Sequence, residues 1–104
     1  MLQQAQDFLA DVEVLAGLLD TLAPDDWNRT TTFKSWTFNQ VVQHLHGTDH
    51  VADLALRDGD AFRAMVSSAT ETRQAMNPVI EGRELLDAWL GKARALGEQM
   101  GALD

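Results

Sequence analysis

Three histidines lie within seven residues of one another, at positions 44, 46 and 50. At about 100° per helical residue, His46 and His50 share a face with Asp53, on the side opposite an apolar stripe. Such an i,i+4 pair can hold a divalent metal, although a solvated polar face is the interpretation that we favour. His44 instead lies at the margin of the apolar stripe and is expected to point towards the protein interior. A single imidazole cannot hold a metal, because about three protein ligands are needed.

The sequence lacks the residues and motifs of several other kinds of catalytic or binding site. The chain has no cysteine, which excludes disulfides, thiolate metal sites and a cysteine nucleophile. No glycine-rich phosphate loop and no Gly-x-Ser-x-Gly elbow occurs. Three tryptophans, Trp27, Trp36 and Trp89, are interpreted as core anchors whose indole N–H groups need partners when buried.

The elements that must position these residues are all helical. Apolar residues recur in steps of three and four, which predicts helices near 3–22, 37–57 and 83–103. The stripes are Met1, Ala5, Phe8, Val12, Leu15, Leu19 and Leu22; then Val41, Val42, Leu45, Ala52 and Leu56; and last Leu86, Trp89, Ala93, Leu96, Met100 and Leu103.

Local signals set the ends of these helices. Thr37 and Gln40 have the capping-box pattern. A weaker helix is expected over 60–76, capped by Asp60 and ended by Asn77-Pro78. The prediction is a single all-α domain, residues 1–104, with the architecture of an up-and-down helical bundle.

The net charge and the hydropathy of the chain argue against a nucleic-acid-binding protein and against a membrane protein. Eight Lys and Arg stand against 16 Asp and Glu, a net charge of -8. We therefore expect no nucleic-acid partner, because phosphate binding needs clustered basic residues. No apolar run approaches the roughly 20 residues of a membrane span, and the N-terminus lacks the pattern of a signal peptide. The sequence predicts a cytoplasmic protein with no membrane association.

Several short motifs occur in an order that resembles one known family. They are Asp26-Trp27, Trp36-Thr37 and Val41-Val-Gln-His44-Leu45, followed by Asp60-Ala-Phe-Arg63 and Glu84-Leu-Leu-x-x-Trp89. Together they are similar to the DinB-like, mycothiol-dependent maleylpyruvate isomerase N-terminal domain superfamily, over roughly residues 5–103. The family's usual glycine before the tryptophan is Ser35 here.

The resemblance implies a DinB-like four-helix bundle that holds a divalent metal, commonly Zn²⁺ or Ni²⁺. Enzymes of the family use the metal to activate a low-molecular-weight thiol such as mycothiol. His44 matches the family's first metal ligand. The family's other ligands come from a later helix, which would begin beyond Asp104.

Two functions follow from this resemblance. The chain is either part of a metal- and thiol-dependent isomerase or transferase, inactive by itself, or a non-catalytic helical module. For the second we expect a homodimer, in which a two-fold interface covers a groove lined by Val42, Val51, Leu56 or Met100. The first function implies a small-molecule substrate.

Overall fold

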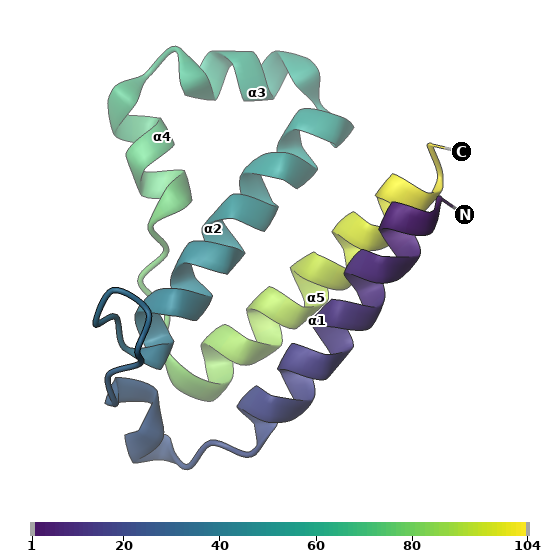
Figure 1. Cartoon of the computed structure of the whole chain (residues 1–104). Helices are drawn as coiled ribbons and strands as arrows, with labels where there is room; N and C mark the ends of the chain where they lie inside the picture. The colour runs from purple at the N-terminus through teal and green to yellow at the C-terminus, as the bar shows by residue number, and fades with distance from the viewer. Residues whose placement is uncertain (1, 104) are drawn as a thin grey trace.

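The computed structural model describes residues 2–103, and these are helical with short connections (Figure 1). Only an isolated antiparallel bridge between Thr30 and Thr37 has β character within this range. The elements are α1 (Gln3–Asp20), the 3₁₀ helix η1 (Pro24–Asn28), α2 (Phe38–Arg57), α3 (Gly59–Val66), α4 (Ala69–Met76) and α5 (Gly82–Gly101). The predicted all-α class is confirmed. Met1, placed in the first predicted stripe, lies outside the described residues.

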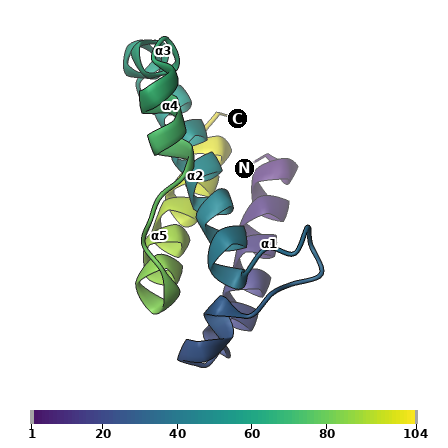
Figure 2. The same ribbon diagram turned by 90° about the vertical axis from the view of Figure 1, so that its left-hand side faces the viewer.

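α5 is the central element of the bundle. Both α1 and α2 pack along it, whereas α1 and α2 do not pack directly against each other. Figure 1 shows α2 and α5 running in the same direction and α1 running in the opposite direction. α3 and α4 form the return from α2 to α5, and both pack on α2 (Figure 2). None of the described helices is long and apolar enough to cross a bilayer.

The predicted helices are present with small changes at their ends. α1 ends at Asp20, two residues before the predicted limit, with Thr21 as its C-cap ahead of Pro24. Thr37 and Gln40 form the expected capping box at the start of α2, with reciprocal bonds of 3.1 and 2.8 Å. α5 begins at Gly82 and ends at Gly101, two residues before the predicted end.

The weaker 60–76 segment is two helices rather than one. The break falls at Ser67–Ser68, where the Ser68 hydroxyl accepts the backbone N–H of Glu71 and so begins a new helix. The predicted cap Asp60 is also wrong. Asp58 caps α3 by accepting the N–H of Ala61, while Asp60 lies in the first turn.

The core lies where α1, α2 and η1 meet α5. Trp89 is 2% exposed, and its indole N–H donates to Asp49 at 3.1 Å. Trp27 on η1 folds back into the same cluster, as predicted. Leu15 and Leu45 are half-buried against it. Gly97 permits close approach of α1, because a Cβ there would lie 2.3 Å from the Leu9 side chain.

The buried face of α2 differs from the predicted one. Its buried residues are Asn39, Val42, Gly47 and Asp53. Going round the helix at about 100° per residue, these positions centre about 120° from Val41, Leu45, Ala52 and Leu56, and of the predicted stripe only Val42 is among them. Leu56 is exposed, and Val41 and Leu45 are only half-buried. The apolar stripe of α2 therefore does not face α5.

Candidate functional site

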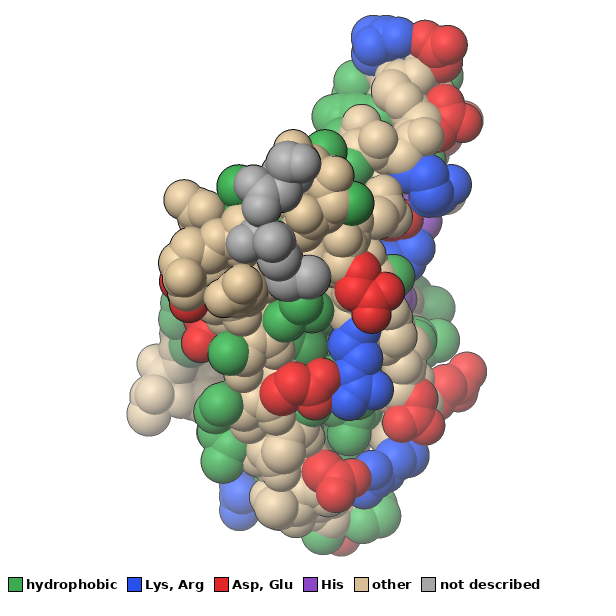
Figure 3. Space-filling view, turned by 90° about the vertical axis from the view of Figure 1, so that its right-hand side faces the viewer, with side chains coloured by type: hydrophobic (Ala, Val, Ile, Leu, Met, Phe, Trp, Pro, Cys, Tyr) green, Lys and Arg blue, Asp and Glu red, His purple; other side chains and the backbone are tan. Residues whose placement is uncertain are grey.

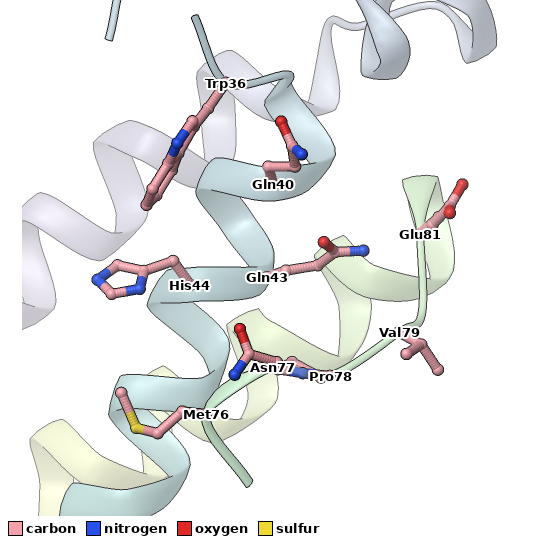
Figure 4. Close-up of a pocket in the computed structure, with 9 residues that line it drawn as sticks. All are labelled: Trp36, Gln40, Gln43, His44, Met76, Asn77, Pro78, Val79 and Glu81. Carbon is pink, nitrogen blue, oxygen red and sulfur yellow. The ribbon is translucent and has the colours of Figure 1, made fainter. Parts of the chain in front are cut away.

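His44 lies on the rim of a cleft of about 490 Å³ beside the first half of α2 (Figure 4). The cleft is lined by Trp36 before the helix, by Gln40, Gln43 and His44 of α2, and by residues that lead from α4 to α5. These are Met76, Asn77, Pro78, Val79 and Glu81. The lining thus combines an imidazole, three side-chain amides, one carboxylate and an indole. These groups can hydrogen-bond to and stack on a polar ligand.

A tight loop holds Trp36 against His44. The two rings meet edge to face with centroids 5.6 Å apart, and Phe33 meets Trp36 in the same way at 5.3 Å. The loop is closed by Thr31, whose N–H and hydroxyl both donate to the Trp36 carbonyl at 2.7 Å. Lys34 and Ser35 have φ of 52° and 59°, the left-handed region that is costly for residues with a Cβ.

The opposite wall of the cleft is tied to α2 by two side-chain amides. Gln43 donates to the carbonyl of Ile80 at 3.0 Å. Buried Asn39 accepts the N–H of Gly82 at 2.8 Å and donates to Asn28 at 3.0 Å. These bonds fix the 77–82 segment relative to α2. Asn39 is absent from the residues predicted from the sequence, because a lone Asn in a helix carries no signal of a distant backbone partner.

The predicted direction of His44 is wrong. Its side chain is exposed rather than directed towards the protein interior. The reason is the orientation of α2, whose face opposite His44 is the one that packs on α5. Trp36 is likewise half-buried on the cleft and is not a core anchor. The role of His44 as a metal ligand stays a prediction, since an exposed imidazole can bind a metal as well as a buried one.

His46 and His50 line a smaller hollow of about 260 Å³ with Gly47, Gln74, Ala75 and Pro78. His46 is half-buried, and within residues 2–103 its Nδ1 is a buried nitrogen with no hydrogen-bond partner. Burial lowers the pKa of His46, and the nearby His50 and Lys92 lower it further. The pair is therefore set into the protein and is not the solvated face that we predicted.

Asp53 is the clearest departure from the predicted polar face. It is buried between α2 and α5, where it accepts bonds from Lys92 at 3.0 Å, from Arg57 at 3.3 Å and from Gln99. Burial alone would raise the pKa of Asp53, but the hydrogen bonds and charges of Lys92 and Arg57 outweigh it and lower the pKa. These partners allow a carboxylate to occupy the core side of α2.

A second hollow runs between α1 and α2, which we call the α1–α2 trough. Its larger part, about 420 Å³, is lined by Leu15, Leu18, Leu19, Thr21, Leu22, Thr31, Phe33, Phe38, Val41 and Val42. A smaller part, about 160 Å³, shares Leu15 and adds Phe8, Asp11, Val12, Leu45, Asp49 and Trp89. Burial raises the pKa of Asp49, and its bond from Trp89 offsets part of that rise. The apolar stripe of α2 thus faces the trough.

The donor set near His44 does not complete a metal site. Across residues 2–103, no three His, Asp or Glu side chains come together in an arrangement that could hold a metal ion. His44 would therefore supply one ligand, and the remaining ligands of a firmly held metal would have to come from elsewhere.

Residues 2–103 form an all-helical bundle, in which one imidazole stands at an open cleft next to an apolar trough. The sequence profile of the mycothiol maleylpyruvate isomerase N-terminal domain matches residues 8–104, and the chain belongs to that family. No curated protein and no solved structure matches the chain.

Proposed function

We propose that this domain binds a divalent metal, Zn²⁺ or Ni²⁺, with His44 as one of its ligands. The observation that carries the proposal is the position of His44. Its ring is exposed, is backed by Trp36, and lies one turn after Val41 of the trough. Ligands from a segment that covers the trough would meet it there. Membership of the family supports this choice over the His46/His50 pair.

The metal would serve thiol chemistry of the kind that the family name describes. When bound, such a metal activates a low-molecular-weight thiol such as mycothiol as thiolate. The residues of this chain would orient the ligand. The amides of Gln40, Gln43 and Asn77 offer hydrogen bonds, and Trp36 offers an aromatic face. The isolated chain should not be catalytic, because one imidazole leaves a metal loosely held.

Metal binding is tested by following the three histidine ring signals by NMR during a Zn²⁺ titration. We expect the His44 signal to shift with a Kd weaker than about 1 µM. The shift should survive in the His46→Ala/His50→Ala double variant, which keeps His44 as its only histidine. Metal uptake by His46 and His50 with an unmoved His44 signal would contradict the proposal. A sub-micromolar site that depends on His44 would show additional ligands in the chain.

Catalysis is tested separately, by assaying maleylpyruvate isomerisation with mycothiol and Zn²⁺. We expect no activity above that of the His44→Ala variant. A clear excess over that variant would contradict the assignment of the isolated chain as inactive.

The second candidate function is that of a non-catalytic module that binds another helix. The open α1–α2 trough is the observation that favours it. Of the four residues that we predicted to line an open groove, only Val42 lines the trough. A homodimer stays a prediction, and light scattering at tens of micromolar tests it. A monodisperse 11.5 kDa monomer that unfolds cooperatively would defeat it.

A further inference from the structure

We infer that the α1–α2 trough is a docking surface for an amphipathic helix whose apolar face is flanked by Lys and Arg. This inference rests on the second candidate function, the helix-binding module, and does not involve His44.

The trough is an unpartnered apolar surface contributed by two helices. Leu15, Leu18 and Leu22 stand on the side of α1, and Phe38 and Val41 on the side of α2. Leu18 is 63% exposed and Phe33, at the edge, is 54% exposed. The predicted stripes of both helices thus converge on one hollow whose floor includes Trp89. A surface of this kind marks an association site.

The backbone hydrogen bonding of α1 and α2 favours a helix as the ligand of the trough. The N–H and C=O groups of α1 and α2 are bonded within their own helices, so the walls offer no free edge to an extended segment. A helix satisfies its own backbone and can enter an apolar hollow without loss. From Phe8 to Leu19 the wall spans 12 residues of α1, a rise of about 16 Å at 1.5 Å per residue, or three turns.

The charges on α1 and α2 favour a helix with basic residues beside its apolar face. Residues 2–28 contain no Lys or Arg, and in α2 the only such residue is Arg57 at its last position. Asp11 and Asp49 both line the trough. The cations of α5 are paired elsewhere, Arg94 with Glu13, Arg83 with Asp20 and Lys92 with Asp53. On the face of Figure 3, acidic and basic side chains accordingly lie side by side.

A second copy of this chain is a poorer occupant than a basic helix. A two-fold contact sets the same surface against itself, so the acidic walls would face each other. Lys34 follows Phe33 at the edge of the trough, but it lies over the rings of Phe33 and Trp36. Like charges in an interface disfavour a partner, whereas opposite charges favour it and speed its association.

The experiment uses two fluorescent model peptides, each an amphipathic helix of about five turns, roughly 18 residues. One has Leu on its apolar face and Lys on the flanks, and the other has Glu in place of Lys. Fluorescence anisotropy should show the Lys peptide binding at least about tenfold more tightly at low salt, with the difference shrinking as salt is added.

Matched variants locate the binding surface. Leu18→Glu in the trough should weaken binding of the Lys peptide at least about tenfold, whereas Val66→Glu on α3, also an exposed aliphatic, should leave it unchanged. Asp11→Asn should weaken binding more than Asp25→Asn, an exposed carboxylate on η1.

Three outcomes would overturn the inference. The first is equal binding of the two peptides or no binding of either. The second is binding that Leu18→Glu leaves intact. The third is a wild-type dimer, seen by sedimentation, that Leu18→Glu dissociates, because a second copy would then be the occupant. Zn²⁺ binding at His44 is measured independently, so its failure and the failure of the docking surface are distinguishable.

Discussion

At the scale of single residues, the 31–37 loop presents Trp36 to His44 at the cost of backbone strain. Ser35 occupies the position where the family usually has glycine, and its φ of 59° is the left-handed conformation that glycine adopts readily. The strained residue directly precedes Trp36, whose ring packs against His44, the proposed metal ligand. A residue with a Cβ in this conformation costs about 1–2 kcal/mol.

Ser35→Gly should therefore stabilise the protein. Glycine removes the free-energy cost of the left-handed conformation in the folded state, and this gain exceeds the additional entropy that glycine loses on folding. We therefore expect the free energy of unfolding to rise by about 0.5–1 kcal/mol. Urea denaturation measures it. Ser67→Gly is the matched control, since Ser67 has φ of -74° and should lose stability on replacement. A loss of stability in both variants would show that Ser35 is unstrained.

Asp53 makes the stability of the protein depend on pH. Because its pKa is lowered in the folded state, its stabilisation is complete above the ordinary value of 3.8 and is lost as the pH falls below it. Asp53→Asn leaves Lys92 without its buried partner and should cost about 3 kcal/mol at pH 7. The difference between variant and wild type should shrink between pH 4 and pH 2 in urea denaturation. A constant difference would contradict the ion pair.

At the scale of elements, glycine sets how closely α4 approaches α2. A Cβ on Gly47 would lie 2.4 Å from the Met76 carbonyl oxygen, and backbone there cannot move without displacing the end of α4. Gly91 on α5 is exposed, and a Cβ added there would have nothing within 4 Å.

Gly47→Ala and Gly91→Ala should act in opposite directions. The first should destabilise the protein by about 1–3 kcal/mol through overpacking, and hydrogen exchange should quicken in α4. The second should stabilise it by up to about 1 kcal/mol through helix propensity. Amide exchange and thermal unfolding measure both, and unchanged exchange in α4 after Gly47→Ala would refute the close contact.

The helices themselves could be predicted, because three-and-four spacing and capping residues act locally. The Thr37–Gln40 box and the turn of Trp27 are examples. The orientation of α2 could not be predicted. Asn39 and Asp53 are polar, and only their partners on distant elements, Gly82 and Lys92, reveal that they face inward. For the same reason the sequence pattern places His44 on the wrong side of the helix, although the family motif around it is matched.

At the scale of the whole molecule, the side of α2 that packs on α5 decides what the domain offers to other molecules. With α1 and α2 both on α5, the space between them is open, and His44 lines the cleft one turn after Val41 of the trough. The metal proposal and the docking surface both depend on this orientation of α2. The orientation also gives opposite environments to Val42 and His44, which are only two positions apart in the sequence.

Cysteine labelling can determine that orientation, because the chain has no cysteine of its own. His44→Cys and Val42→Cys are compared with Val79→Cys, at an 85% exposed position, by the rate of maleimide modification under native conditions. We predict that position 44 reacts within about tenfold of position 79. Position 42, which is 1% exposed, should react at least about a hundredfold more slowly, because modification requires opening of the fold. Protection at position 44 together with rapid reaction at position 42 would show that α2 packs on α5 through the other face.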